Sequence, residues 1–202
     1  GGVSLISVRQ GEAMGLAHAI KCAEPIVGRS PFAVLLPDVI IDDAAADPQK
    51  DNLAEMVKRF EESGNPQIMV EKVPHNLLNS YGIVDLNGKS LESGQSVPIK
   101  SIVEKPEIDK APSDFAVVGR YVLPAEIWPL FKRTPLGAGG EFQLTDTIDL
   151  LMELETIDAY CIKGRSHDCG NKQGYVTTFI EYAARHPVIG QQVKLFLKEL
   201  IK

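Results

Sequence analysis

Residues 32–43 read Phe-Ala-Val-Leu-Leu-Pro-Asp-Val-Ile-Ile-Asp-Asp. Five successive apolar residues without polar alternation predict a strand buried on both faces, and in α/β proteins such a strand lies centrally in a parallel sheet. Pro37 has no N–H to donate to a neighbouring strand, so it ends this strand and places Asp38 just past the carboxyl end. Ligands of open α/β sheets bind at that edge of the sheet.

Asp38 is therefore a candidate ligand for a hard cation. Mg²⁺ takes one or two protein carboxylates and leaves its remaining positions to water and phosphate oxygens. The alternative role for Asp38 is a turn aspartate that caps the following segment. Asp42 and Asp43 are interpreted as solvated loop or cap residues, and Asp47 is expected to cap a helix with Pro48 at its first position. These neighbours favour Asp38 as the functional carboxylate.

Composition favours one α/β domain over residues 1–202, with a C-terminal helical segment at about 172–202. The net charge of −6 and the scattered Lys and Arg residues argue against a nucleic-acid or anionic-membrane surface. No stretch reaches the roughly 20 apolar residues of a membrane span. The three cysteines lack metal-site spacing and fit a reducing cytoplasm. Because the chain starts without Met and enters a predicted strand at once, we expect it to be a fragment.

Hydrophobic periodicity predicts alternating strands and helices. Strands are expected at residues 3–8, 32–36, 67–73, 81–86, 99–104, 115–123 and 157–163. Helices are expected after Gly15, over 53–60 with Gly64 as terminator, over 124–133, after 144 and from 174. The first half indicates a parallel, doubly wound sheet, and residues 81–123 an antiparallel excursion. The apolar stripe near the C-terminus suits docking on the domain or on another subunit.

Polar residues near predicted strand ends are the candidate binding groups. The Gln10 amide both donates and accepts, as a group that reads a base edge must, although an ordinary loop residue is the alternative. Glu104 and Lys105 follow each other at a strand end, so their side chains should point to opposite faces and form no mutual salt bridge. Glu104 could accept hydrogen bonds from sugar hydroxyls and Lys105 could neutralise a phosphate; exposed edge residues are the alternative. Asp168 is a possible further metal ligand.

Seven short segments, in order along essentially the whole chain, match the pattern of one known family. They are Arg9–Glu12 with Gly15–Ala19, Leu36–Val39, Tyr81-Gly82, Val103–Pro106, Val118–Tyr121, Gln143–Asp146 and His167–Gly170. Together they resemble the bacterial UTP-glucose-1-phosphate uridylyltransferases. Any single segment is weak evidence, whereas seven in sequence are specific.

The resemblance implies an α/β, Rossmann-like nucleotidyltransferase fold, with a mixed, mostly parallel sheet flanked by helices and a small antiparallel excursion. The implied reaction makes UDP-glucose and pyrophosphate from UTP and glucose 1-phosphate with Mg²⁺. In-line attack of a sugar phosphate on the α-phosphorus needs positioning and charge neutralisation, with no covalent intermediate. A cytoplasmic homo-oligomer that binds neither nucleic acid nor membrane is expected.

The resemblance also assigns substrate-binding roles by position. Gln10 and Gly15 would read uracil, Glu104 would contact sugar hydroxyls, and Gly82 and Gly119 would line the sugar pocket. These roles are implied by the resemblance.

The charged residues of the reaction are assigned in the same way. Asp38 and Asp168 would hold the metal, and Lys105 would face the sugar phosphate, which makes Lys105 and Asp38 the expected catalytic residues. One feature departs from the family: its Gly-x-Gly-Thr-Arg nucleotide loop, with a downstream Lys, is absent from this sequence. We therefore expect this chain to bind UDP-glucose weakly without measurable uridylyl transfer.

Two alternatives remain at this point. A sister transferase could use dTTP, because uracil and thymine differ by one methyl group, worth roughly 1–3 kcal/mol in a pocket. A non-catalytic nucleotide-sugar-binding or regulatory homologue could share the fold. Retention of Asp38, Lys105 and Asp168 argues against the second alternative.

Overall fold

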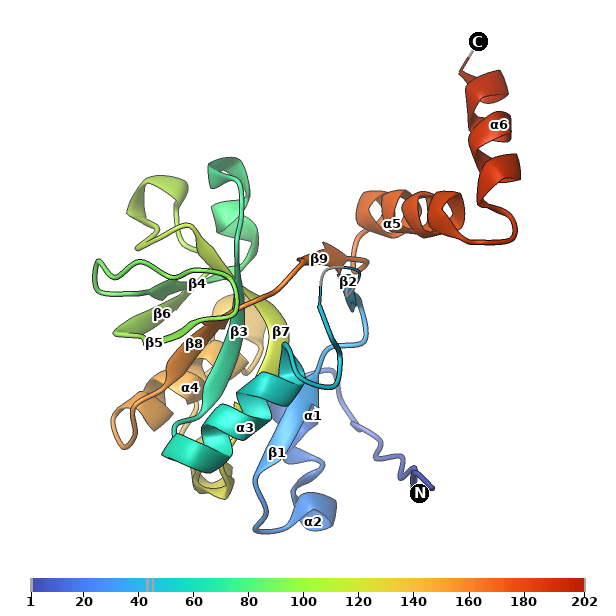
Figure 1. Ribbon diagram of the computed structural model, residues 1–202. Helices are drawn as coiled ribbons and strands as arrows, with labels where there is room; N and C mark the ends of the chain where they lie inside the picture. The colour runs from blue at the N-terminus through green and yellow to red at the C-terminus, as the bar shows by residue number, and fades with distance from the viewer. Residues whose placement is uncertain (1, 43, 45, 202) are drawn as a thin grey trace.

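The computed structural model describes residues 2–42, 44 and 46–201, and Figure 1 shows their arrangement. Within this part of the chain, helices flank a seven-stranded mixed sheet, a two-stranded ribbon stands beside it, and two C-terminal helices extend away. The sheet contains β1 (Phe32–Leu35), β3 (Gln67–Lys72), β4 (Gly82–Asp85), β5 (Ser96–Pro98), β6 (Ser101–Glu104), β7 (Phe115–Leu123) and β8 (Asp158–Cys161). The ribbon pairs β2 (Val39–Asp42) with β9 (Arg165–Asp168).

A mixed sheet flanked by helices is confirmed, but its pairing is less parallel than expected. The order is β5-β8-β3-β7-β4-β6, with β1 also paired to β7. Among the described strands, β3 with β8 is the parallel pair, and the other pairs are antiparallel. The long strand β7 runs antiparallel to β1, β3 and β4, so these three strands share one direction without being hydrogen-bonded neighbours.

Strand β1 forms where the sequence predicts it, but it is not buried on both faces. Its burial alternates, and Leu35 is 52% exposed. Within the described residues β1 pairs with β7, and α3 packs on β3 and β7 instead. Pro37 does end the strand: with Asp38 it forms the turn that leads into β2.

Two local predictions near the N-terminal third are wrong. Residues 3–8 form no strand, and Val3 is 96% exposed, because β-prone residues need a partner strand to pair with. Asp47 caps a turn through the Gln49 N–H (3.0 Å), and no helix follows Pro48.

Helical segments form at the predicted positions, and four further short segments, at residues 24–27, 75–80, 108–110 and 138–140, were not predicted. In chain order the helices and 3₁₀ segments are α1 (Leu16–Lys21), α2 (Glu24–Val27), α3 (Leu53–Ser63), η2 (His75–Ser80), η3 (Ile108–Lys110), η4 (Ala125–Lys132), η5 (Ala138–Gly140), α4 (Leu144–Met152), α5 (Lys172–Arg185) and α6 (Gly190–Leu200). Gly64 ends α3 in a left-handed conformation, with its N–H donating to Phe60 O. The helix expected over 124–133 is 3₁₀, and Pro129 within it lacks an N–H.

The core lies on both faces of the sheet because successive residues of a strand point to opposite sides. On β3, Ile68 and Val70 face the cluster formed with α1, α4 and η4, whereas Met69 faces the cluster beneath α3. All three side chains are fully buried. Each contributes roughly 1.5–3 kcal/mol to folding by leaving water.

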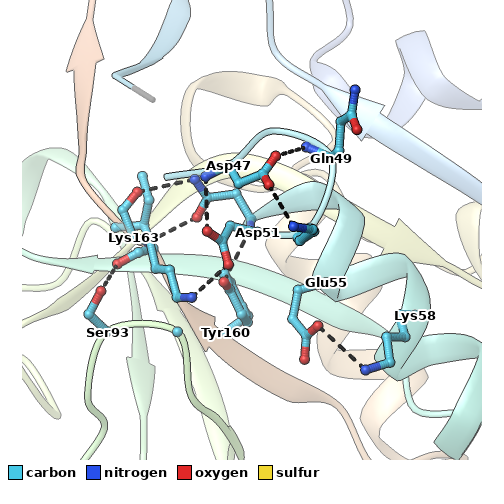
Figure 2. A network of polar contacts seen from close by, with 12 residues as sticks. Asp47, Gln49, Asp51, Glu55, Lys58, Ser93, Tyr160 and Lys163 are labelled. Carbon is cyan, nitrogen blue, oxygen red and sulfur yellow. Dashed lines mark hydrogen bonds and ion pairs between the residues drawn. The ribbon is translucent and has the colours of Figure 1, made fainter. Parts of the chain in front are cut away.

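Polar contacts fix the start of α3 to the end of β8 (Figure 2). Asn52 exchanges two hydrogen bonds with the Lys163 backbone, at 3.1 and 2.9 Å, and its own N–H donates to the Tyr160 hydroxyl. The Lys163 ammonium donates to Asp51 at 2.6 Å. Asn52 has a φ of 55° and a ψ of −119°, an uncommon conformation for a residue other than glycine, and these hydrogen bonds hold it there.

The C-terminal arm, defined as α5 and α6, extends from the body beside the β2–β9 ribbon (Figure 1). Asn171 caps α5 by accepting from the Gly174 N–H at 2.8 Å. Many apolar side chains of the arm are exposed, including Phe179 at 66%. None of the described helices combines the length and apolar character needed to cross a membrane.

Candidate active site

A cavity of about 400 Å³ lies along the middle of β7 and at the ends of β3, β4, β6 and β9, beside the start of α4. Five of the predicted site residues line it: Asp38, Gly82, Glu104, Gly119 and Asp168. They come from five separate segments of the sequence. The fold therefore brings most of the predicted site together in one place.

Asp38 and Asp168 converge across Gly170. A Cβ on Gly170 would lie 2.8 Å from Asp38 Oδ2 and 3.1 Å from Asp168 Oδ1, so only glycine leaves both carboxylates this room. The Cys169 N–H donates to the Asp38 carbonyl at 2.7 Å, which ties the two turns together. Carboxylate oxygens are ligands that suit Mg²⁺.

The Asp168 carboxylate is held by its own turn. The Gly170 N–H donates to Oδ1 at 2.8 Å, and Asn171 Nδ2 donates to Oδ2 at 3.1 Å. Tyr81 reaches the same carboxylate from the other side of the cavity. Burial, together with the negative charges of Asp168 and Glu71 and a hydrogen bond to Asp168, raises the pKa of the Tyr81 hydroxyl. That hydroxyl therefore stays a proton donor.

Glu104 occupies the far wall, at the end of β6. Burial raises the pKa of its carboxyl; Lys105 and a hydrogen bond with Thr145 act in the opposite direction, and Asp146 raises it further. A Cβ on Gly82 would lie 3.2 Å from Glu104 Oε2 and 3.2 Å from Thr145 Cγ2. The glycine thus keeps the carboxylate accessible from the cavity.

Gly119 is required by both space and backbone. Its φ is +69°, and a Cβ there would lie 2.9 Å from two Leu36 side-chain carbons. Any other residue at this position would push β7 away from the strand end that carries Asp38.

Lys105 corrects one prediction. Its Nζ lies 4.0 Å from Glu104 Oε1, so the two side chains form an ion pair that strict strand alternation forbids. The strand ends at Glu104, and Lys105 adopts a φ of 44° with its N–H donating to Tyr81 O at 3.0 Å. This turn brings the ammonium back to the side of Glu104. Lys105 itself is not among the residues that line the cavity.

Gln10 and Gly15 also lie outside the residues that line the cavity. Gln10 Nε2 donates to Gly15 O at 3.2 Å and lies 2.9 Å from His18 Nδ1, so its amide is engaged within its own segment. Gly15 has a φ of +94°, and a Cβ there would lie 2.6 Å from Phe142 O. The close approach of these two chain segments explains this glycine.

Known proteins resemble this chain in sequence and in structure. Residues 2–185 match the family model described as nucleotidyl transferase. The chain belongs to the nucleotidyl transferase family. It is 55% identical to a UTP--glucose-1-phosphate uridylyltransferase of Escherichia coli K12 over 98% of its length, and it spans 65% of that relative.

Solved structures agree with this membership of the nucleotidyl transferase family. A UTP-bound UGPase from Acinetobacter baumannii matches 98% of the chain with a TM-score of 0.87 and 45% identity, and 66% of that protein is covered. A UDP-glucose pyrophosphorylase complexed with UDP-glucose matches 89% of the chain with a TM-score of 0.80 and 34% identity, again with 66% covered.

Sequence reasoning missed Glu71, Ser166 and Thr145, which also line the cavity of this nucleotidyl transferase chain. Glu71 has the same sequence signal as Asp38: it is an acidic residue that follows a buried apolar run. Ser166 and Thr145 have no comparable signal, because single hydroxyl residues are common on any strand or helix.

Asp42 corrects another prediction, because it is 8% exposed and not solvated. Arg185 donates to Asp42 Oδ2 at 2.8 Å, and this hydrogen bond lowers the pKa of the carboxyl. Asp42, His167 and Glu181 lie close enough to hold a metal. However, Arg185 and Arg165 already neutralise the two carboxylates, so we interpret the group as an ion-pair network. Asp43 lies outside the described residues.

Proposed function

We propose that the protein transfers a uridylyl group from UTP to glucose 1-phosphate, giving UDP-glucose and pyrophosphate. The observation that carries this proposal is the convergence of Asp38 and Asp168 in the same cavity as Glu104. The names of the relatives support the same reaction.

In this proposal Asp38 and Asp168 hold a divalent cation, Mg²⁺, between the β1–β2 turn and the end of β9. When bound, the cation neutralises phosphate charge and orients the phosphate oxygens. The two aspartates contribute fixed negative charge, and the Gly170 and Asn171 donors keep the Asp168 carboxylate oriented before a ligand arrives.

Glu104 accepts hydrogen bonds from sugar hydroxyls. A carboxylate in a largely buried wall makes strong hydrogen bonds to neutral hydroxyl donors, and the raised pKa of Glu104 reflects the same burial. Gly82 and Gly119 leave space for a sugar ring beside it, because a side chain at either position would meet Glu104, Thr145 or Leu36.

Lys105 neutralises the sugar phosphate. Of the three non-glycine residues with positive φ in the described chain, two are asparagines and the third is Lys105. Lysine adopts this conformation at an energetic cost, and such strain concentrates at functional positions. The strained turn holds the ammonium next to Glu104, at the junction between sugar and phosphate.

Gln10 and Gly15 read the uracil ring in this proposal. For this, the Gln10 amide exchanges its contact with His18 for the base edge, while the Gly15 turn keeps the backbone close.

A cytoplasmic location and self-association complete the proposal. The cysteines Cys22, Cys161 and Cys169 are free thiols, as is usual in a reducing compartment. The exposed apolar side chains of the C-terminal arm offer a surface for a second copy of the protein. A regulatory homologue without activity is not favoured, because the metal-type carboxylates and Lys105 are all retained.

Calorimetry of UDP-glucose binding to the 202-residue chain, with and without Mg²⁺, tests the proposal. We expect weak binding that Mg²⁺ strengthens, and Asp38→Asn should remove that strengthening without changing the melting temperature. Glu62→Gln, an exposed carboxylate on α3 paired with Lys58, is the matched control. Equal Mg²⁺ dependence in wild type and Asp38→Asn would contradict the metal role.

A pyrophosphate-release assay with UTP or dTTP and glucose 1-phosphate tests the reaction itself. We expect pyrophosphate release with UTP when the chain is extended to the length of its relatives, and absence of release from that longer protein would contradict the proposed reaction. Preferential binding of dTDP-glucose over UDP-glucose would favour the sister transferase.

A further inference from the structure

The side chain of Glu71 connects two separate sheets. Glu71 belongs to β3 of the central sheet, whereas Ser166 belongs to β9 of the two-stranded ribbon. Glu71 Oε2 accepts hydrogen bonds from the Ser166 N–H at 3.0 Å and from the Ser166 hydroxyl at 2.5 Å. Both residues line the same cavity as the two aspartates.

The ribbon carries both proposed metal ligands at one end. Asp168 is the last residue of β9 and pairs with Val39, and Asp38 immediately precedes Val39. A shift of the ribbon therefore moves the two carboxylates together. Their separation would stay the same, but their distance from Glu104 and Gly82 on the central sheet would change.

We propose that Glu71, through Ser166, is a positioning residue that sets the metal-binding ribbon in register with the sugar-binding wall of the central sheet. This inference rests on the proposed function, because it presumes a cation at Asp38 and Asp168 and a sugar at Glu104. Charge-assisted hydrogen bonds of this type are short and strong enough to hold such a register. Their loss uncouples the two halves of the site without dismantling either half.

The test measures the coupling between metal and nucleotide sugar. Calorimetry on the 202-residue chain gives the affinity for Mn²⁺ alone, for UDP-glucose alone, and for UDP-glucose at saturating Mn²⁺. The coupling is the factor by which Mn²⁺ strengthens UDP-glucose binding. We expect Glu71→Gln and Ser166→Ala each to reduce that factor about tenfold, the loss expected for a hydrogen bond to a charged group.

The separate affinities distinguish positioning from direct contact. Under the proposal, both variants bind Mn²⁺ alone and UDP-glucose alone within about twofold of wild type. The double variant should lose no more coupling than either single variant, because the two residues act through one contact. Ser63→Ala is the matched control, since its hydroxyl donates to Arg59 O at 2.7 Å within α3.

Three results would overturn the inference. Unchanged coupling in Ser166→Ala contradicts the proposal, which assigns the hydroxyl a share of the positioning although the backbone N–H still donates to Glu71, and this variant remains informative if Glu71→Gln does not fold. If Glu71→Gln weakens the affinity for Mn²⁺ alone or for UDP-glucose alone, and Ser166→Ala does not, then Glu71 touches the metal or the sugar directly. Absence of Mn²⁺ binding in wild type refutes the metal site of the proposed function, and the inference fails with it.

Discussion

Apolar helical residues have opposite environments in two regions of the molecule. In α4, Leu151 is fully buried against the central sheet. In the C-terminal arm, the chemically identical Leu195 on α6 is 52% exposed. Both helices are amphipathic, so the pattern predicts helices equally well in both places. Burial of the apolar face also requires a surface for the helix to pack against.

The two regions are also held by different forces. The body around the cavity is stabilised by apolar packing on both faces of the sheet. Where it meets the ribbon, the arm is held by charged contacts among Asp42, Arg165, Glu181 and Arg185. Substitutions should therefore affect the body strongly and the arm weakly.

The same substitution in the two regions gives the largest contrast. Leu151→Ala should lower the free energy of unfolding by about 2–5 kcal/mol, because it opens a cavity in a packed core. At protein concentrations low enough to keep the chain monomeric, Leu195→Ala should change it by less than about 0.5 kcal/mol, as for other exposed positions. Urea denaturation at several protein concentrations measures both. A large, concentration-dependent loss in Leu195→Ala would show that a second copy buries the arm.

Glu104→Gln should improve stability while it damages binding. The pKa of Glu104 is raised by burial, so folding favours its protonated form, and its ionisation costs stability as the pH rises from 4.5 through the raised value. The glutamine variant should therefore be more stable than wild type at pH 7 and equally stable in acid. UDP-glucose affinity should fall about 10- to 100-fold, the cost of losing a charged acceptor.

Denaturation as a function of pH, together with calorimetry, checks the Glu104 prediction. Glu107→Gln is the control, because Glu107 is exposed and paired with Lys110 on the surface. Lower stability of Glu104→Gln at pH 7 would mean that hydrogen bonds and charges around the ionised carboxylate outweigh the cost of its burial.

Lys105→Asn should raise the free energy of unfolding by about 1 kcal/mol, because asparagine tolerates the left-handed conformation better than lysine. Lys105→Met retains the strain and should leave stability nearly unchanged. Both variants lose the cation, and both should bind glucose 1-phosphate about tenfold more weakly. Thermal melting and calorimetry on the pair separate strain from charge; a destabilised Lys105→Asn would contradict the strain argument.

Asp42→Asn should affect only the attachment of the arm. The hydrogen bond from Arg185 lowers the pKa of Asp42, so its stabilising contribution is present above pH 3.8 and is lost as the pH falls through the lowered value. At pH 7 the amides in the last turn of α5, next to Arg185, should exchange on the order of fivefold faster in the variant, with no change in β3. Hydrogen exchange measures this; unchanged exchange in α5 would show that apolar contacts hold the arm.

Most secondary structure could be predicted from the sequence, because the signals are local. Gly64 after an apolar helical stripe ends α3, and β7 occupies the predicted residues 115–123. The predictions that failed also rest on local patterns, but those patterns require a packing partner that the described residues do not supply. Residues 3–8 have the β-propensity of a strand, and Leu35 the apolarity of a core residue, yet neither meets the partner that its pattern presumes.

Sequence patterns alone were enough to select the residues that we propose for the site. Asp38, Gly82, Glu104, Gly119 and Asp168 stand out at strand ends and in family motifs, and all five line one cavity. The contacts between these side chains could be identified only from the folded structure. The Glu104–Lys105 ion pair follows from a positive φ, and the Glu71–Ser166 contact joins residues 95 positions apart. Side-chain hydrogen bonds reach only a few ångströms, so pairs distant in sequence become visible once the folded backbone brings them together.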